Sequence, residues 1–231
     1  MTPTAGLALA TLAFVGTHLA MSHPLRPALA ARFGERGFLG LYSLISFLTL
    51  GWMIFAWRGI GPEAPLWIAP LEWWPIASGL MLAASILLVG SLIGNPAFPN
   101  IAGPPRAIPP PQGVFAITRH PMNSSFILWA GVHVSLSGSA RNLIVSGGIL
   151  ILALLGSLGQ DRKKRLMLGQ TWRDWEARTS FVPFGALLGG RAAWRDAFPG
   201  WIALVGGALL WALVTSYHAP MVSPLGDLLS R

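Results

Sequence analysis

The shortage of charged side chains constrains this chain more than any other feature. Asp, Glu, Lys and Arg make up 10% of its 231 residues, whereas hydrophobic residues make up 53%. An average soluble domain is about 25% charged. A chain with so few charges cannot cover a surface that faces water, so the lipid bilayer is its expected solvent. This excludes a disordered chain and almost any water-soluble globular domain.

The apolar residues gather in stretches that suit membrane-spanning helices. A helix needs roughly 20 residues to cross the bilayer core. Six stretches reach or approach that length, near residues 4–22, 38–57, 74–94, 122–138, 142–160 and 198–217. We therefore predict an all-α fold, a polytopic integral membrane helix bundle with about six transmembrane helices, formed as a single domain over residues 1–231.

The distribution of basic residues predicts the orientation of the bundle. Thirteen of the 16 Lys and Arg residues fall in loops on one side of the predicted spans. Cytoplasmic loops are enriched in Lys and Arg, so both termini are expected in the periplasm of a bacterial inner (cytoplasmic) membrane. The first apolar stretch is followed rather than preceded by arginine, which favours a retained helix over a signal peptide. The net charge of +8 then indicates contact with anionic lipid rather than nucleic acid.

Two of the predicted cytoplasmic segments have a distinct character. Residues 95–121 contain eight prolines, a density that excludes a helix and predicts a rigid, extended loop. Residues 161–178 place Leu166, Leu168, Trp172 and Trp175 among charged residues. That pattern is typical of an amphipathic helix lying on the membrane surface.

The histidines are the strongest candidates for chemistry. Only His18 and His133 of the five fall inside predicted spans, where ionisable side chains are costly and often functional. Small neighbours, Gly16 beside one and Ala130 and Gly131 beside the other, leave room for a flat, bulky group. Each histidine could instead form a hydrogen bond to a Ser or Thr on another helix. The chain has no Cys, so a haem would be a non-covalent haem b with imidazole ligands.

The depths of the two histidines are an obstacle to one shared iron. His18 lies about one helical turn from the predicted inner end of its span, and His133 lies about three turns from Pro121. His120 is the alternative ligand. With Arg119, His120 could also hold a phosphate or carboxylate at the membrane surface, a haem propionate included. The alternative for this pair is a cationic cap that faces anionic headgroups.

Three stretches of the sequence together resemble the NnrU family of bacterial membrane proteins, which includes plant and cyanobacterial zeta-carotene isomerases. They read THLAMSHPLRPALAARFGERGFLGLYSLISF, TRHPMNSSFILWAGVHVSLSG and DRKKRLMLGQTWRDWEARTSFVPFGALLGGR. In the isomerase branch the resemblance implies a haem b that supports redox-dependent cis–trans isomerisation of a carotenoid double bond. The ligand histidines of that branch match His18 and His133. Its cysteine three residues before the second histidine is replaced here by Ala130. The bacterial branch is associated with nitrite and nitric oxide metabolism.

Two other functions stay open at this point. The R-H-P block and the later W-x-x-W and Pro-Phe elements also resemble isoprenylcysteine and phospholipid methyltransferases, and this resemblance implies S-adenosylmethionine bound near Arg119, His120, Pro121 and Glu176. A non-catalytic haem redox sensor subunit of a denitrification system is the third class. The expected partners are membrane lipid and a hydrophobic small molecule or haem. The sequence does not predict the oligomeric state.

Overall fold

A computed structural model describes residues 1–98 and 108–217. Four of its helical segments are long and apolar enough to cross a membrane. They are α1 (Pro3–Ser22), α2 (Arg26–Arg58), Leu71–Ser91 and α6 (Ala140–Leu168), the third being a short 3₁₀ turn followed by α3 (Trp74–Ser91). The predicted all-α class is confirmed, since no strand occurs in these two ranges.

Two further helices, of which α9 (Trp201–Ser216) is apolar, are shorter. Helices α5 (Pro121–Leu136) and α9 have 16 residues each, which corresponds to about 24 Å against a hydrocarbon core of about 30 Å. The membrane location follows from the four long apolar helices, whereas the number of six spans and the orientation of the termini stay predictions. The remaining described helices are short, namely α4 (Val114–Ile117), α7 (Gln170–Arg178), α8 (Gly185–Leu188) and the 3₁₀ turn Trp194–Ala197.

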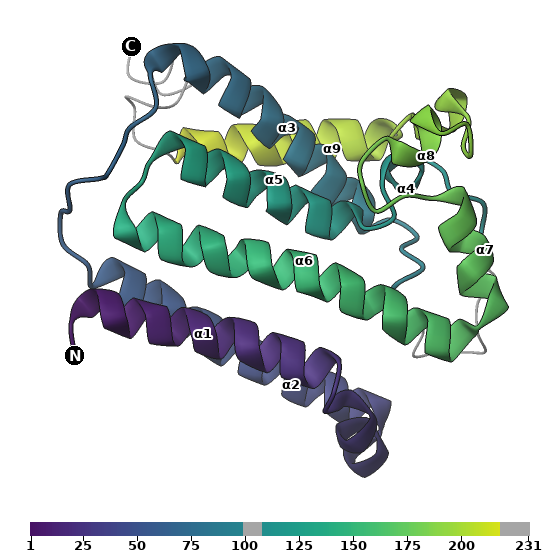
Figure 1. Ribbon diagram of the computed structural model, residues 1–231, viewed down its shortest axis with the longest axis horizontal. Helices are drawn as coiled ribbons and strands as arrows, with labels where there is room; N and C mark the ends of the chain where they lie inside the picture. The colour runs from purple at the N-terminus through teal and green to yellow at the C-terminus, as the bar shows by residue number, and fades with distance from the viewer. Residues whose placement is uncertain (99–107, 218–231) are drawn as a thin grey trace. The chain divides into compact units, whose positions relative to one another are not determined.

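The chain divides into two compact units. Of the described residues, unit 1 contains 1–68, 97–98 and 133–168, and unit 2 contains 69–96, 108–132 and 169–217. Unit 1 is built on α1, which packs against both α2 and α6 (Figure 1). Its core consists of apolar side chains near the N-terminal end of α1 and the C-terminal end of α2, namely Leu7, Ala10, Phe14, Val15, Met53 and Ile60.

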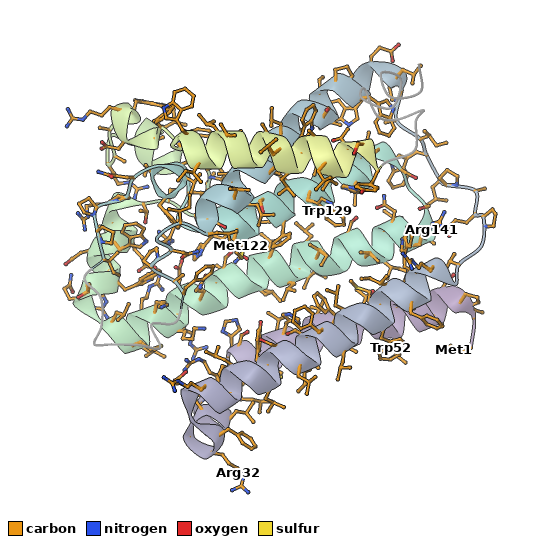
Figure 2. The ribbon with its side chains drawn as sticks, turned by 180° about the vertical axis from the view of Figure 1, so that it is seen from behind. Met1, Arg32, Trp52, Met122, Trp129 and Arg141 are labelled. Atoms are coloured by element: carbon orange, nitrogen blue, oxygen red, sulfur yellow. The ribbon has the colours of Figure 1, made fainter. Side chains whose placement is uncertain are left out.

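Glycines on α6 set the close packing and the register of α1 in unit 1. The side chain of Thr11 occupies the place where a Cβ of Gly148 would be, and the ring of His23 does the same at Gly159. Because the residue numbers rise together on the two helices, α1 and α6 run parallel. Figure 2 shows Met1 and Arg141 at one end of this unit and Arg32 at the other. Arg141 is paired there with Glu63 at 3.4 Å.

Unit 2 is held together by α3 against α9. The backbone of α3 at Ile86 approaches Gly207, and Gly90 receives Val114 and Ala203. Glycine lets helix backbones approach closely where lipid supplies no hydrophobic driving force.

Two local predictions were wrong. The proline-rich segment contains the helical turn α4, because Gly113 (φ +62°) begins it and Pro111 precedes it rather than interrupts it. Residues 99–107 of this segment lie outside the described part. The amphipathic helix begins only at Gln170, because Gly169 (φ +55°) separates it from α6, which continues to Leu168.

The predicted membrane-surface placement of that helix also fails for its tryptophans. Trp172 and Trp175 are 0% and 1% exposed, and Trp175 packs against Phe115 with ring centroids 6.3 Å apart. The indoles therefore form protein core within unit 2 instead of dipping into lipid. Only Leu166, at 82% exposed, keeps the expected accessibility.

Candidate functional site

His18 lies on α1, one turn before the helix ends at Ser22. Its Nδ1 is 2.9 Å from the carbonyl oxygen of Phe14. A carbonyl can only accept, so Nδ1 carries the hydrogen, and Nε2 of the neutral ring is left with its lone pair. Metal-ligating histidines adopt this arrangement, in which one ring nitrogen donates to a backbone carbonyl and the other binds the metal. The half-buried side chain of His18 is therefore arranged as the side chain of a metal-binding histidine would be.

Tyr42 completes the surroundings of His18 and was not predicted from the sequence. Its ring lies edge-on to the imidazole, with centroids 5.3 Å apart. Its hydroxyl oxygen accepts a hydrogen bond of 3.3 Å from the Ser22 hydroxyl. The chain has only two tyrosines, so an isolated Tyr in an apolar stretch was the one available sign. Residues 24 positions apart meet here only because α2 folds back along α1.

His133 lies near the C-terminal end of α5, and its backbone belongs to a polar hairpin. The side-chain amide of Asn142 donates to the carbonyl oxygens of His133 and Ser137, both at 2.6 Å. The Ser146 hydroxyl donates to Asn142 Oδ1 at 3.0 Å. Asn142, which the sequence analysis did not single out, thus ties the end of α5 to the start of α6.

The two histidines lie at different levels of unit 1. On α6, Asn142 marks the level of His133. Because α1 touches α6 at Gly148 and Gly159, His18 is level with Leu154 and Leu155. The offset is about 12 residues, or about 18 Å of helix rise. Two ligands of one metal ion must lie at nearly the same level, so His18 and His133 do not present a pair of ligands to a single ion in this arrangement.

Arg119 and His120 lie in unit 2, where two of the sequence blocks meet. The backbone N–H of Arg119 donates to the Ser180 carbonyl at 2.7 Å, and its guanidinium donates to the Thr179 hydroxyl at 3.3 Å. Thr118 donates from its hydroxyl to the Phe181 carbonyl at 3.0 Å. The R-H-P block is thus fastened along the T-S-F segment that follows α7.

His120 is buried at the start of α5, 4% exposed. Its ring lies edge-on to Phe181, with centroids 6.0 Å apart. Burial in a packed interface makes His120 a part of the contact between the two blocks. The predicted cationic cap, a side-chain pair open to lipid headgroups, therefore does not describe His120.

The family model described as NnrU protein matches residues 6–224. The chain belongs to the NnrU family. Two curated relatives are 15-cis-zeta-carotene isomerases of chloroplasts. The isomerase of Zea mays is 30% identical over 79 residues, which cover 34% of this chain and 22% of the relative. The isomerase of Arabidopsis thaliana is 32% identical over 79 residues, with the same two shares. The matched segment of this NnrU protein thus covers about a fifth of the length of these relatives. No solved structure matches the chain significantly.

Proposed function

We propose that this NnrU protein is a membrane-embedded isomerase of a carotenoid-like polyene, and that it binds haem b through His18. The similarity to two 15-cis-zeta-carotene isomerases carries the proposal. The long apolar helices support it, because a polyene hydrocarbon dissolves in the bilayer and would reach the protein from the lipid side. When bound, the haem would supply a redox-active iron at which a double bond can be isomerised.

The residues around His18 supply what such a site needs from the protein. The bond from Nδ1 to the Phe14 carbonyl fixes the ring, with its centroid 4.2 Å from that of Phe14. The Tyr42 hydroxyl, held by Ser22, places a polar group beside the imidazole in otherwise apolar surroundings. We propose Tyr42 as a positioning residue for His18. His133 and His120, predicted from the sequence as alternatives for a second ligand, are tested by substitution, and Arg119 stays a sequence-based prediction for a propionate partner.

The test of the haem proposal is an absorption spectrum of the purified protein, reduced minus oxidised, after expression with ample haem supply. We expect a haem b spectrum that His18→Ala abolishes. His133→Ala and His120→Ala test the two sequence-based candidates for a second ligand, and His218→Ala is the matched control, which should leave the spectrum unchanged. A protein without haem, or a spectrum that His18→Ala leaves intact, contradicts the proposal. Calorimetric titration with S-adenosylmethionine then tests the methyltransferase alternative, which micromolar binding would establish.

The isomerase proposal needs its own measurement. Membranes containing the protein are incubated with 15-cis-zeta-carotene, and the isomers are separated chromatographically. We expect loss of the 15-cis isomer under reducing conditions, and no loss with His18→Ala. A haem-loaded protein that leaves the polyene unchanged would favour a role in nitrite and nitric oxide metabolism or a redox sensor subunit.

A further inference from the structure

A second polar cluster lies in unit 1, where α1 ends and α2 begins. His23 closes α1, and its ring lies against Gly159 of α6, in the space that a side chain there would fill. Both ring nitrogens are buried and have no hydrogen-bond partner among the described residues. Buried polar groups are almost always hydrogen-bonded, so a ring with two unsatisfied nitrogens indicates a partner from outside the described residues.

Positive side chains surround this imidazole. Lys163 lies one helical turn beyond Gly159 on the same face of α6, and it is close enough to His23 to repel a positive charge on the ring. Arg26, at the start of α2, repels Lys163, whereas Glu35 attracts it. Positive charge and N–H donors from three parts of unit 1 therefore gather at one point. They belong to Lys163 on α6, Arg26 at the start of α2 and His23 in the link between α1 and α2.

One acid near this point, Glu35, offsets part of the positive charge. Glu35 pairs with Arg26 at 2.8 Å, and its side chain is 51% exposed, so water screens much of that contact. The guanidinium of Arg26 also lies 5.3 Å from the centre of the Phe38 ring, which fixes its position. Asp161 and Lys164 are both buried on α6, and Lys164 adds a further positive charge that repels Arg26 and Lys163.

A cluster of this kind can bind an anionic oxygen group. Like charges held together at a membrane surface cost free energy, which a bound anion offsets. Lys and Arg form strong charge-assisted hydrogen bonds to phosphate, and the imidazole adds a donor. The cluster follows the end of the apolar helix α1, where a membrane-spanning helix is expected to reach the lipid headgroups. Lys163 lies toward the C-terminal end of α6, whereas Arg141 lies at its start. In the predicted orientation the C-terminal end of α6 faces the cytoplasm, where the leaflet is rich in anionic lipid.

We propose that His23, Arg26 and Lys163 form a binding site for the phosphate of an anionic phospholipid headgroup. The bound phosphate accepts from the imidazole N–H and from the two cations. This seats the lipid at the junction of α1, α2 and α6. The site is separate from the haem proposal and does not depend on it.

The test is lipid binding to the delipidated full-length protein in neutral detergent, measured by native mass spectrometry. Phosphatidylglycerol, phosphatidylcholine and inorganic phosphate are added in parallel. We expect retention of phosphatidylglycerol in preference to the other two. Arg26→Gln and Lys163→Gln should each weaken it about tenfold, the scale of one hydrogen bond to a charged group. Arg195→Gln is the matched control, since the Arg195 side chain is 89% exposed in unit 2.

Three outcomes would overturn this assignment. One is equal retention of phosphatidylglycerol and phosphatidylcholine, and another is equal binding by the variants and the control. The third is binding of inorganic phosphate as strong as that of the lipid, which would make the site one for free phosphate. Arg26→Lys keeps the charge and serves where Arg26→Gln fails to fold, with an expected loss smaller than tenfold.

Discussion

Substitution of Gly148 tests the packing of α1 on α6 most directly. Thr11 Cγ2 occupies the place where a Cβ at position 148 would be, whereas a Cβ at Gly147 would meet nothing within 4 Å. Both glycines lie in α6, so Ala at either position gains the same helix propensity, about 0.5–1 kcal/mol. The difference between Gly148→Ala and Gly147→Ala therefore isolates the steric cost at the interface.

The cost of that overlap follows from the stiffness of the partner. Thr11 is β-branched, so Cγ2 cannot turn away without placing another γ atom against the helix. Overpacking of this kind costs about 1–3 kcal/mol. For a chain of this length, each kcal/mol lowers the melting temperature by about 2–4 °C. We expect Gly148→Ala to melt about 2–12 °C below Gly147→Ala.

The assay is thermal unfolding in detergent, followed by tryptophan fluorescence. A second variant makes the test specific, since Thr11→Ser removes Cγ2 and keeps the hydroxyl. In the background of Gly148→Ala it should recover most of the lost stability, which a double-mutant cycle measures. Equal melting temperatures for the two alanine variants, or no recovery with Thr11→Ser, would refute the close approach of α1 to α6 at this level.

Two further predictions concern His23 and Trp175. Burial and the positive charge of Lys163 lower the pKa of His23 below its usual 6.5, so the unfolded chain binds more protons than the folded one once the pH falls below about 6.5. The melting temperature of the lipid-free protein should fall from pH 7 to pH 5.5, and His23→Gln should flatten that part of the profile; an unchanged slope would contradict this assignment. Trp175→Ala should lower the free energy of unfolding by about 3–5 kcal/mol because its indole is buried in the core. Trp201→Ala, at a site 73% exposed, should lower it far less. Similar losses for the two variants would show that α7 packs differently.

Residue types alone are enough to select candidates for chemistry. His18 and His133 stand out because ionisable side chains are rare and costly in apolar stretches, and Arg119 and His120 stand out as a cationic pair before Pro121. The partners of these residues could not be predicted in this way. Tyr42 beside His18 depends on how α2 folds back, which no local pattern encodes.

The sequence by itself determined the solvent and the class of fold. A chain with 10% charged residues and long apolar stretches has to satisfy its backbone groups within helices in lipid, and this holds whatever the helices pack against. Local composition also determined where helices such as α1 and α9 lie, to within a few residues, because length and hydropathy are properties of a segment and need no neighbour.

Only the tertiary structure decided which residues lie at the same height along neighbouring helices and which helix faces are covered by protein. The offset of about 18 Å between His18 and His133 follows from which glycines on α6 receive α1, and the burial of Trp172 and Trp175 follows from the turn at Gly169. An amphipathic pattern states that one face is apolar without stating whether lipid or protein covers it. That choice depends on contacts between residues far apart in the chain, and such contacts form only when the helices assemble.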